Sequence, residues 1–98
     1  MAQFDVHWID SGGLVLDCQA DVFRGIGTRF VVPLMPEGEG PPTNPRLHPR
    51  FDVNGETLVM MTELATAIRT SELRSRTGSL AHDRLRIIGA IDALTGSG

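Results

Sequence analysis

The sequence predicts a mainly β, α+β domain, in which a small barrel-like sheet of about five antiparallel strands is followed by one C-terminal helix. Short apolar runs separated by turn residues fill the chain as far as Leu64, and the short connections between them favour antiparallel hairpins. The strongest helical periodicity lies in Ser79–Gly98. With 98 residues, of which 41% are hydrophobic and 21% charged, we expect a single domain over residues 1–98.

The N-terminal segment is predicted to form a hairpin. Apolar and polar residues alternate in Gln3–Ile9, which is the period of a strand with one buried face. Asp10–Gly13 supplies turn residues, and Leu14–Gln19 forms the returning strand. Cys18, the single cysteine, lies in this strand and is expected to be a buried, unreactive thiol. The residues expected to be buried in the first strand are Phe4, Val6 and Trp8.

The next segment, Ala20–Thr28, is predicted to be a loop because two glycines interrupt it. It nevertheless contains the apolar residues Val22, Phe23 and Ile26. These side chains either fold back to cover the core or present an apolar patch to a partner. Covering the core is the default interpretation.

A third strand is expected over Arg29–Leu34, which is rich in β-branched and aromatic residues. Pro33 cannot donate a hydrogen bond to a neighbouring strand, so it is expected to mark the end of this strand or an edge position. Met35–Pro45 holds four of the six prolines and is predicted to be a surface loop.

Two more strands are predicted beyond this loop. They are Arg46–Val53 and Glu56–Leu64, joined at Asn54-Gly55, a strong signal for a two-residue hairpin turn. The pattern of Ala65–Ser75 fits either a short helix or a weaker edge strand, and we leave both open.

The final segment, Ser79–Gly98, carries start and stop signals for a helix. Ser79 or Asp83 can accept a hydrogen bond from the first turn, and Gly96 suits the left-handed residue that often ends a helix. Gly89, in the middle of the helix, indicates either close backbone packing or simple tolerance of a glycine at that position. The expected apolar face consists of Leu80, Leu85, Ile87, Ile88, Ile91 and Leu94.

Charge and composition argue against several functional classes. A formal net charge of -3 and a pI near 5.5 do not favour binding to nucleic acid through the overall field. No apolar run approaches the roughly 20 residues of a membrane span, and no leader pattern opens the chain, so we expect a cytoplasmic protein without membrane contact. The last third contains five arginines that we interpret as a solvated face: Arg69, Arg74, Arg76, Arg84 and Arg86.

Catalytic and metal motifs are weak. His7, His48 and His82 are far apart in the sequence, so neither a metal nor another cofactor is expected. No nucleophile motif of the Gly-x-Ser-x-Gly type is present. Arg29 and Thr28 are conceivable members of a small ribonuclease site, although no spacing singles them out.

Five segments, in matching order, resemble the CcdB-type toxin family. The resemblance covers nearly the whole chain. The segments are Met-x-Gln-Phe-x-Val at Met1–Val6, the stretch Leu16–Val22, Gly-x-Arg-x-Val-x-Pro-Leu at Gly27–Leu34, Val59–Thr62, and Leu80–His82 before the C-terminal helix.

The resemblance implies a homodimer built on an SH3-like barrel, acting as the toxin of a bacterial toxin–antitoxin pair. Such toxins bind the DNA gyrase A subunit and poison its complex with cleaved DNA, so the implied inhibition is by binding, and a cognate antitoxin neutralises it. Carried over by position, the gyrase-facing residues are Val22, Phe23, Arg24, Arg84, Leu85, Ile88, Gly89, Asp92, Gly96, Ser97 and Gly98.

The chain departs from the family at its end. The best-known members end in Trp-Gly-Ile, whereas Gly96, Ser97 and Gly98 stand here. An aromatic anchor can contribute several kcal/mol to an interface, and glycine has no side chain to replace it. Two alternatives therefore accompany the gyrase-poisoning toxin. One is a MazF-like endoribonuclease on the same fold, and the other is a degenerate toxin that retains its fold and antitoxin binding but no longer poisons gyrase.

Overall fold

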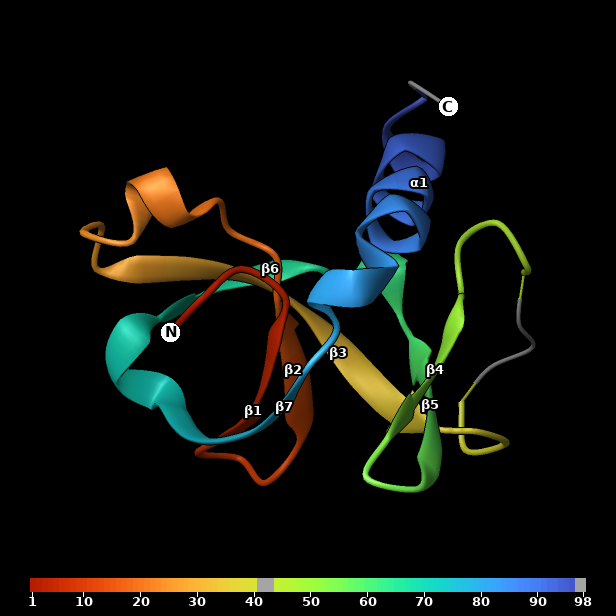
Figure 1. Cartoon of the computed structure of the whole chain (residues 1–98), viewed down its shortest axis with the longest axis horizontal. Coiled ribbons are helices and arrows are strands. Elements are labelled where there is room, and N and C mark those ends of the chain that lie inside the picture. Colours follow the sequence, from red (N-terminus) through yellow and green to blue (C-terminus); the bar gives the residue numbers. More distant parts are fainter. Residues whose placement is uncertain (41–43, 97–98) are drawn as a thin grey trace.

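The computed structural model describes residues 1–40 and 44–96. In these residues, seven strands form one strongly curled antiparallel sheet, and one α-helix follows it (Figure 1). The predicted α+β, mainly β fold is confirmed. The strands are β1 (Asp5–Ile9), β2 (Leu14–Asp17), β3 (Thr28–Pro36), β4 (Arg50–Val53), β5 (Glu56–Met60), β6 (Thr66–Arg69) and β7 (Leu73–Ser79). The helix is α1 (Arg84–Thr95), and four short 3-10 turns are η1 (Asp21–Phe23), η2 (Thr62–Leu64), η3 (Thr70–Glu72) and η4 (Ala81–Asp83).

Strand β3 organises the sheet, because it pairs with β2 along one edge and with two strands in succession along the other. Its first half pairs with β6 and its last residues pair with β5. Pro33 lies between these two pairings, and its carbonyl accepts a hydrogen bond from the amide of Met61 at 2.9 Å. Pro33, which has no N–H to donate, therefore lies where the strand paired with this edge of β3 changes from β6 to β5. The predicted strand end at Leu34 is too early, because β3 continues to Pro36.

The two predicted hairpins are present. Antiparallel pairing joins β1 to β2 and β4 to β5. At the second turn Asn54 and Gly55 have φ values of 52° and 82°, as a type I′ turn requires. The predicted strands are too long: residues 46–49 lie outside β4, with a turn at residues 45–47, and β5 ends at Met60, before η2. Pro49 explains the late start of β4, because it has no N–H to give to a ladder.

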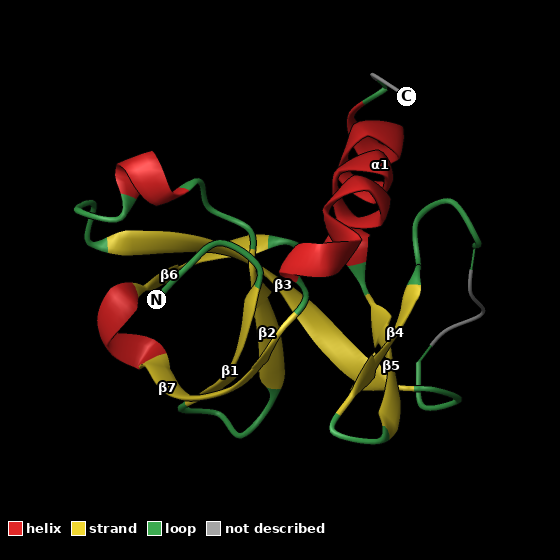
Figure 2. Ribbon diagram, in the orientation of Figure 1, coloured by secondary structure: helices red, strands yellow, loops and turns green. Residues whose placement is uncertain are grey.

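The segment with the ambiguous pattern forms strands and not a helix. β6 pairs with β3, η3 reverses the chain, and β7 pairs with β1 (Figure 2). β7 continues to Ser79, so the predicted helix began too early; α1 itself starts at Arg84. Ser79 still accepts a hydrogen bond near the helix start, since its hydroxyl binds the amide of Ala81 at 3.2 Å.

The apolar core lies between the sheet and α1. Ile87 and Ala90 of the helix, together with Leu80 before it, are buried against it. The predicted apolar face of the helix is wrong at two positions, because Leu85 is 84% exposed and Leu94 is 45% exposed. The core consists of Phe4, Val6, Leu16, Val32, Leu34, Phe51, Val53, Leu58, Met60, Leu80, Ile87 and Ala90.

The alternation predicted for the first strand holds only in part. Phe4 and Val6 are buried, but Trp8 is 44% exposed, and its pairing partner Leu14 is only partly buried. Asp5 and His7 are buried as well, and both contact β7: Oδ1 of Asp5 lies 3.1 Å from Nε of Arg76, and Nδ1 of His7 lies 2.9 Å from the carbonyl oxygen of Arg74. Within the described residues, no helix is long and apolar enough to cross a lipid bilayer.

Candidate partner-binding surfaces

The most conspicuous exposed apolar residues lie in and after η1. Val22 is 81% exposed, Phe23 is 55% exposed, and Ile26 is 52% exposed. The default interpretation, that these side chains cover the core, is therefore wrong. No residue of η1 is buried, so the core does not need the apolar character of Val22 and Phe23.

Polar side chains hold η1 in place. The Gln19 amide donates to the carbonyl of Phe23 at 2.9 Å, and its oxygen accepts the amide of Phe30 at 2.9 Å. The carboxylate of Asp21 accepts the amide of Gln3 at 2.8 Å. Hydrogen bonds thus fix the backbone of η1, while its apolar side chains point away from the packed interior.

A buried ion pair lies under this attachment. Nη2 of Arg29 is 2.6 Å from Oδ2 of Asp17, and both side chains are 0% exposed. Oδ1 of Asp17 accepts the amide of Gln19 at 3.1 Å, so η1 is connected to the ion pair through Gln19. Burial, followed by the negative charge of Asp17, raises the pKa of the neighbouring Cys18 to about 12. That thiol therefore stays protonated at neutral pH.

The second predicted surface is the exposed side of α1. Arg84 and Leu85 are exposed, whereas Ile88 and Asp92 are partly buried. Arg84 is oriented by two contacts, a hydrogen bond from Nη1 to Oε1 of Gln3 at 3.1 Å and a position 5.6 Å from the centroid of the Phe4 ring. This side of the helix therefore presents one apolar side chain, Leu85, next to an oriented arginine.

The helix ends where the sequence predicts. Gly96 has a φ of 85°, in the left-handed region, and its N–H binds the carbonyl of Asp92. Thr95 adds a hydrogen bond from its hydroxyl to the carbonyl of Ile91 at 3.1 Å. Ser97 and Gly98, the other two predicted tail residues, lie outside the described residues.

Within the described residues, Gln3 links the two surfaces at one end. Gln3 contacts both, because its side chain accepts Arg84 and its backbone donates to Asp21. Beyond that link, η1 (orange) and the later turns of α1 (blue) lie at separate corners of the molecule in Figure 1. In one chain, Val22, Phe23 and Arg24 therefore form one patch, and Leu85, Ile88 and Asp92 form another.

A model of the CcdB protein family matches residues 3–96. The chain belongs to the CcdB family. This match confirms the resemblance that the five sequence segments predict. CcdB-family proteins are toxins of toxin–antitoxin systems that target gyrase. No curated protein matches the chain.

The positions of Arg29 and Thr28, the two ribonuclease candidates, do not favour a ribonuclease site, and this agrees with membership of the CcdB family. Arg29 is 0% exposed and bound to Asp17 through both Nε and Nη2, so it cannot reach an RNA phosphate without disrupting the fold. Thr28 is exposed in β3 and pairs with Arg69 of β6. The geometry gives these two residues no common reactive site, and the ribonuclease alternative is not favoured.

Three residues hold these surfaces in ways that the sequence does not predict. The backbone amide of Gln3 and the side chain of Gln19 anchor η1, and Arg86, predicted to lie on a solvated face, reaches across to β4. Its Nη2 donates to the carbonyl of Arg50 at 2.7 Å. The sequence offers no signal for these roles, because each hydrogen bond depends on how the chain folds and not on the residue types alone. In the described residues, no group of three or more His, Cys, Asp or Glu side chains is arranged to hold a metal ion.

Proposed function

We propose that this CcdB-family protein is the toxin of a type II toxin–antitoxin pair, which binds the DNA gyrase A subunit as a homodimer and poisons the gyrase–DNA complex. It acts by binding, without catalysis and without reading a DNA sequence by itself. A cognate antitoxin neutralises it, and its target places it in the cytoplasm.

The observation that carries this proposal is the exposed pair Val22 and Phe23 on a firmly held turn. Large apolar side chains that are exposed without contributing to a core are typical of interaction sites. Because η1 is already ordered by Gln19 and Asp21, binding does not have to bear the entropy cost of fixing its backbone. Phe23 can therefore serve as an aromatic anchor in a pocket of the partner.

The exposed side of α1 supplies the second half of the proposed surface. Leu85 is 84% exposed in the first turn of α1, next to Arg84, and Asp92 lies about two turns further along the helix. An apolar residue surrounded by charges of both signs matches the usual pattern of an interface, with an apolar centre and a polar rim.

A homodimer suits the amount of apolar surface that a single chain leaves exposed. Besides the residues already named, Trp8, Phe30 and Leu94 are each between 43% and 45% exposed. A two-fold dimer covers part of this surface and presents each remaining patch twice. Such symmetry suits a target that is itself a symmetric dimer.

The test uses the purified full-length chain and the dimerisation core of gyrase A. We expect the double variant Val22→Ser, Phe23→Ser to lose affinity by about 30-fold or more, which corresponds to about 2 kcal/mol. Leu64→Ser is the matched control, because Leu64 is 49% exposed but lies outside the proposed surface. Equal affinity of the double variant and the wild type, with both folded, would contradict the proposal.

Expression in two bacterial hosts tests the target in the cell. We expect toxicity in a host with sensitive gyrase and none in a host with a resistant gyrase A subunit. Toxicity that persists in the resistant host would remove gyrase as the target and reopen the ribonuclease alternative. Light scattering at micromolar concentration checks the dimer, and a monomer would overturn that part of the proposal.

The helix end favours one second candidate, a degenerate toxin. Gly96 contributes no side chain at the position where family members carry an aromatic residue, and its φ of 85° is one that other residues adopt at a cost of about 1 kcal/mol. A harmless protein in both hosts supports this candidate. The combined variant Gly96→Trp, Ser97→Gly, Gly98→Ile then tests the tail directly, because gyrase A binding that does not improve would show that the missing anchor is not the cause.

A further inference from the structure

The two ends of the sheet are joined by the side chain of a turn residue. Strands β4 and β7 lie at opposite ends of the main strand path. Nδ2 of Asn54, in the turn after β4, donates to the carbonyl of Thr77 in β7 at 3.0 Å and to the Thr77 hydroxyl at 2.8 Å. Beside this contact, a Cβ atom built on Gly78 would lie 3.6 Å from Cγ1 of Val53. We call this pair of hydrogen bonds the Asn54–Thr77 clasp.

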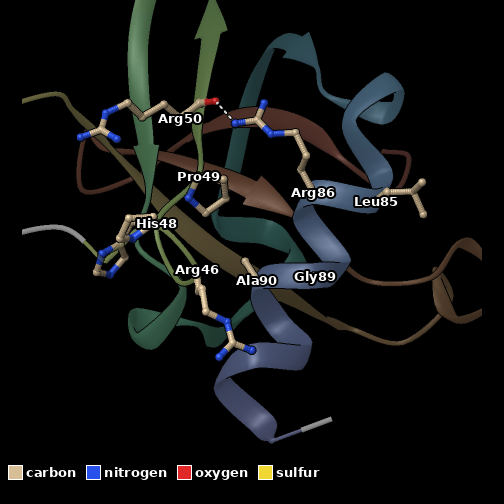
Figure 3. A pocket seen from close by; sticks show the side chains of 9 residues that line it. Arg46, His48, Pro49, Arg50, Leu85, Arg86, Gly89 and Ala90 are labelled. Atoms are coloured by element: carbon tan, nitrogen blue, oxygen red, sulfur yellow. Dashed lines mark hydrogen bonds between the residues drawn. The ribbon is translucent and has the colours of Figure 1, made fainter. Parts of the chain in front are cut away.

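Strand β4 is fastened at its other end by α1. Nη2 of Arg86 donates to the carbonyl of Arg50 at 2.7 Å, as the dashed line in Figure 3 shows. The guanidinium group of Arg86 lies 4.6 Å from the centroid of the Phe51 ring. Between these two attachments, Phe51 and Val53 are buried in the core. The clasp at Asn54 therefore holds one end of a strand that the core needs.

The residue that forms the clasp is chemically vulnerable. The chain contains two asparagines, Asn44 and Asn54. Asn44 precedes Pro45, whose nitrogen carries no hydrogen, whereas Asn54 precedes Gly55, which has no side chain to hinder the approach of its nitrogen. Asn54 and Gly55 are both exposed, and Gly55 lies in the turn, outside the ladder that pairs β4 with β5. Of the two asparagines, Asn54 is thus the one whose neighbour can attack it.

We propose that Asn54 is a site of spontaneous deamidation, which weakens the clasp. The backbone nitrogen of Gly55 loses its proton to hydroxide and bonds to Cγ of Asn54. The bond from Cγ to Nδ2 then breaks, and Nδ2 leaves as ammonia with a proton taken from water. A second water molecule opens the cyclic imide at either of its two carbonyl carbons, which gives aspartate or isoaspartate. The reaction needs water and hydroxide alone, and it does not rest on gyrase binding.

The clasp slows this reaction. Nδ2 carries two hydrogens, and its two acceptors are the carbonyl and the hydroxyl of Thr77. Departure of ammonia requires both hydrogen bonds to break first. Deamidation should therefore proceed from molecules in which the turn has opened away from β7, and it should be slower in the folded protein than in the unfolded chain.

Either product weakens the attachment of β4 to β7. A carboxylate has no hydrogen to donate, so it loses the bond to the Thr77 carbonyl and retains at most a bond from the Thr77 hydroxyl. It also adds a third negative charge to a short stretch that already holds Asp52 and Glu56. Isoaspartate additionally lengthens the backbone at a turn residue whose φ is 52°. The hairpin of β4 and β5 should therefore loosen as the protein ages.

The first experiment follows deamidation of the full-length protein at mildly alkaline pH by peptide mass spectrometry. We expect the mass increase of an NH₂ group replaced by OH at Asn54, and no increase at Asn44. Thr77→Val removes one acceptor of the clasp and should speed the reaction about fivefold. Thr66→Val, at an exposed threonine of β6, is the matched control and should react as the wild type does. Unfolding in urea should speed the reaction further.

The second experiment compares fresh protein with aged protein from which the deamidated form has been isolated by ion exchange. We expect hydrogen exchange at the β4 amides to be about tenfold faster in the deamidated form and in Asn54→Asp. Asn44→Asp adds the same charge elsewhere and keeps the oxygen that accepts the amide of Arg46, so it should exchange as the wild type does.

Three results would overturn the proposal. One is an unmodified Asn54 in the folded protein after the urea-unfolded chain has reacted completely. Another is an equal rate of deamidation in the wild type and in folded Thr77→Val, which would show that the clasp does not control the reaction. The third is unchanged hydrogen exchange at the β4 amides of the deamidated form. Gyrase A binding is not a readout in either experiment, so failure here leaves the proposed function untouched.

Discussion

The turn η1 and the turn before β4 are built in the same way and present opposite chemistry. In η1, the side chain of Gln19 holds the backbone, and Val22 and Phe23 are displayed. In the second turn, Asn44 and His48 hold the backbone, and Arg46 lines a groove between this turn and α1. Both turns have a fixed shape that does not depend on the side chains they expose.

In both turns, the residues that bind the backbone are different from the residues that are exposed to a partner. Substitution of Val22 or Phe23 should alter binding while the fold is retained, since surface substitutions usually change stability by less than about 0.5 kcal/mol. Substitution of the holding residues should alter the fold first. The predictions below test that distinction, from the largest expected effect to the smallest.

Asp17→Asn should produce the largest loss of stability. It leaves the fully buried guanidinium group of Arg29 without a counter-charge, and breaking a buried pair in this way costs about 3–5 kcal/mol. Urea denaturation monitored by fluorescence of Trp8 measures the free energy of unfolding. Asp52→Asn, at an exposed position of β4, is the control. A loss of less than about 1 kcal/mol for Asp17→Asn would show that the ion pair does not support this region.

Gln19→Leu should loosen η1 without disturbing the second turn. It removes two hydrogen bonds, to the carbonyl of Phe23 and from the amide of Phe30, each with a net value of about 1 kcal/mol. Hydrogen exchange should become faster at the amide of Phe30 and remain unchanged at the amide of Asn44. His48→Phe should give the reverse pattern. If either variant loosened both turns, the two would not be independent.

Gly89→Ala should raise stability by about 1 kcal/mol. Alanine is the better helix former, and its Cβ has open space at this position. The midpoint of urea denaturation should rise with an unchanged slope. Ala93→Gly, one turn further along α1, should lower the midpoint by a similar amount. A loss of stability in Gly89→Ala would contradict this prediction, because it would mean that the added Cβ meets a neighbouring atom.

The sequence was sufficient for the elements whose signals are local. The alternating strand residues and Asn54-Gly55 act through neighbours in the chain, and Gly96 ends α1 as its αL preference dictates. The residue pattern alone could not predict the exposure of Val22 and Phe23, because apolar residues in a glycine-rich loop look the same whether they face the core or the solvent; only the family resemblance placed both on an exposed surface. The groove was also beyond reach, since Arg46 and Arg86 come together only after the sheet has placed α1 beside β4.

Glu63→Gln should have the smallest effect, and that effect should depend on pH. Burial acts to raise the pKa of Glu63, but the hydrogen bond from His48, a backbone hydrogen bond and the attraction to His48 together lower it below its ordinary value of 4.5. A carboxyl group whose pKa is lower in the folded state stabilises the protein above the unfolded-state pKa, and this contribution is lost as the pH falls through the folded-state value.

The side chain of Glu63 is 37% exposed, so solvent screening limits its contribution to less than about 1 kcal/mol. Wild type and Glu63→Gln should therefore differ in unfolding free energy at pH 6 and converge well below pH 4.5. Glu56→Gln, an exposed carboxyl in the β4–β5 hairpin, serves as the control for general charge effects. A difference that stayed constant down to low pH would mean that the bond from His48 holds the turn equally well without the carboxylate charge.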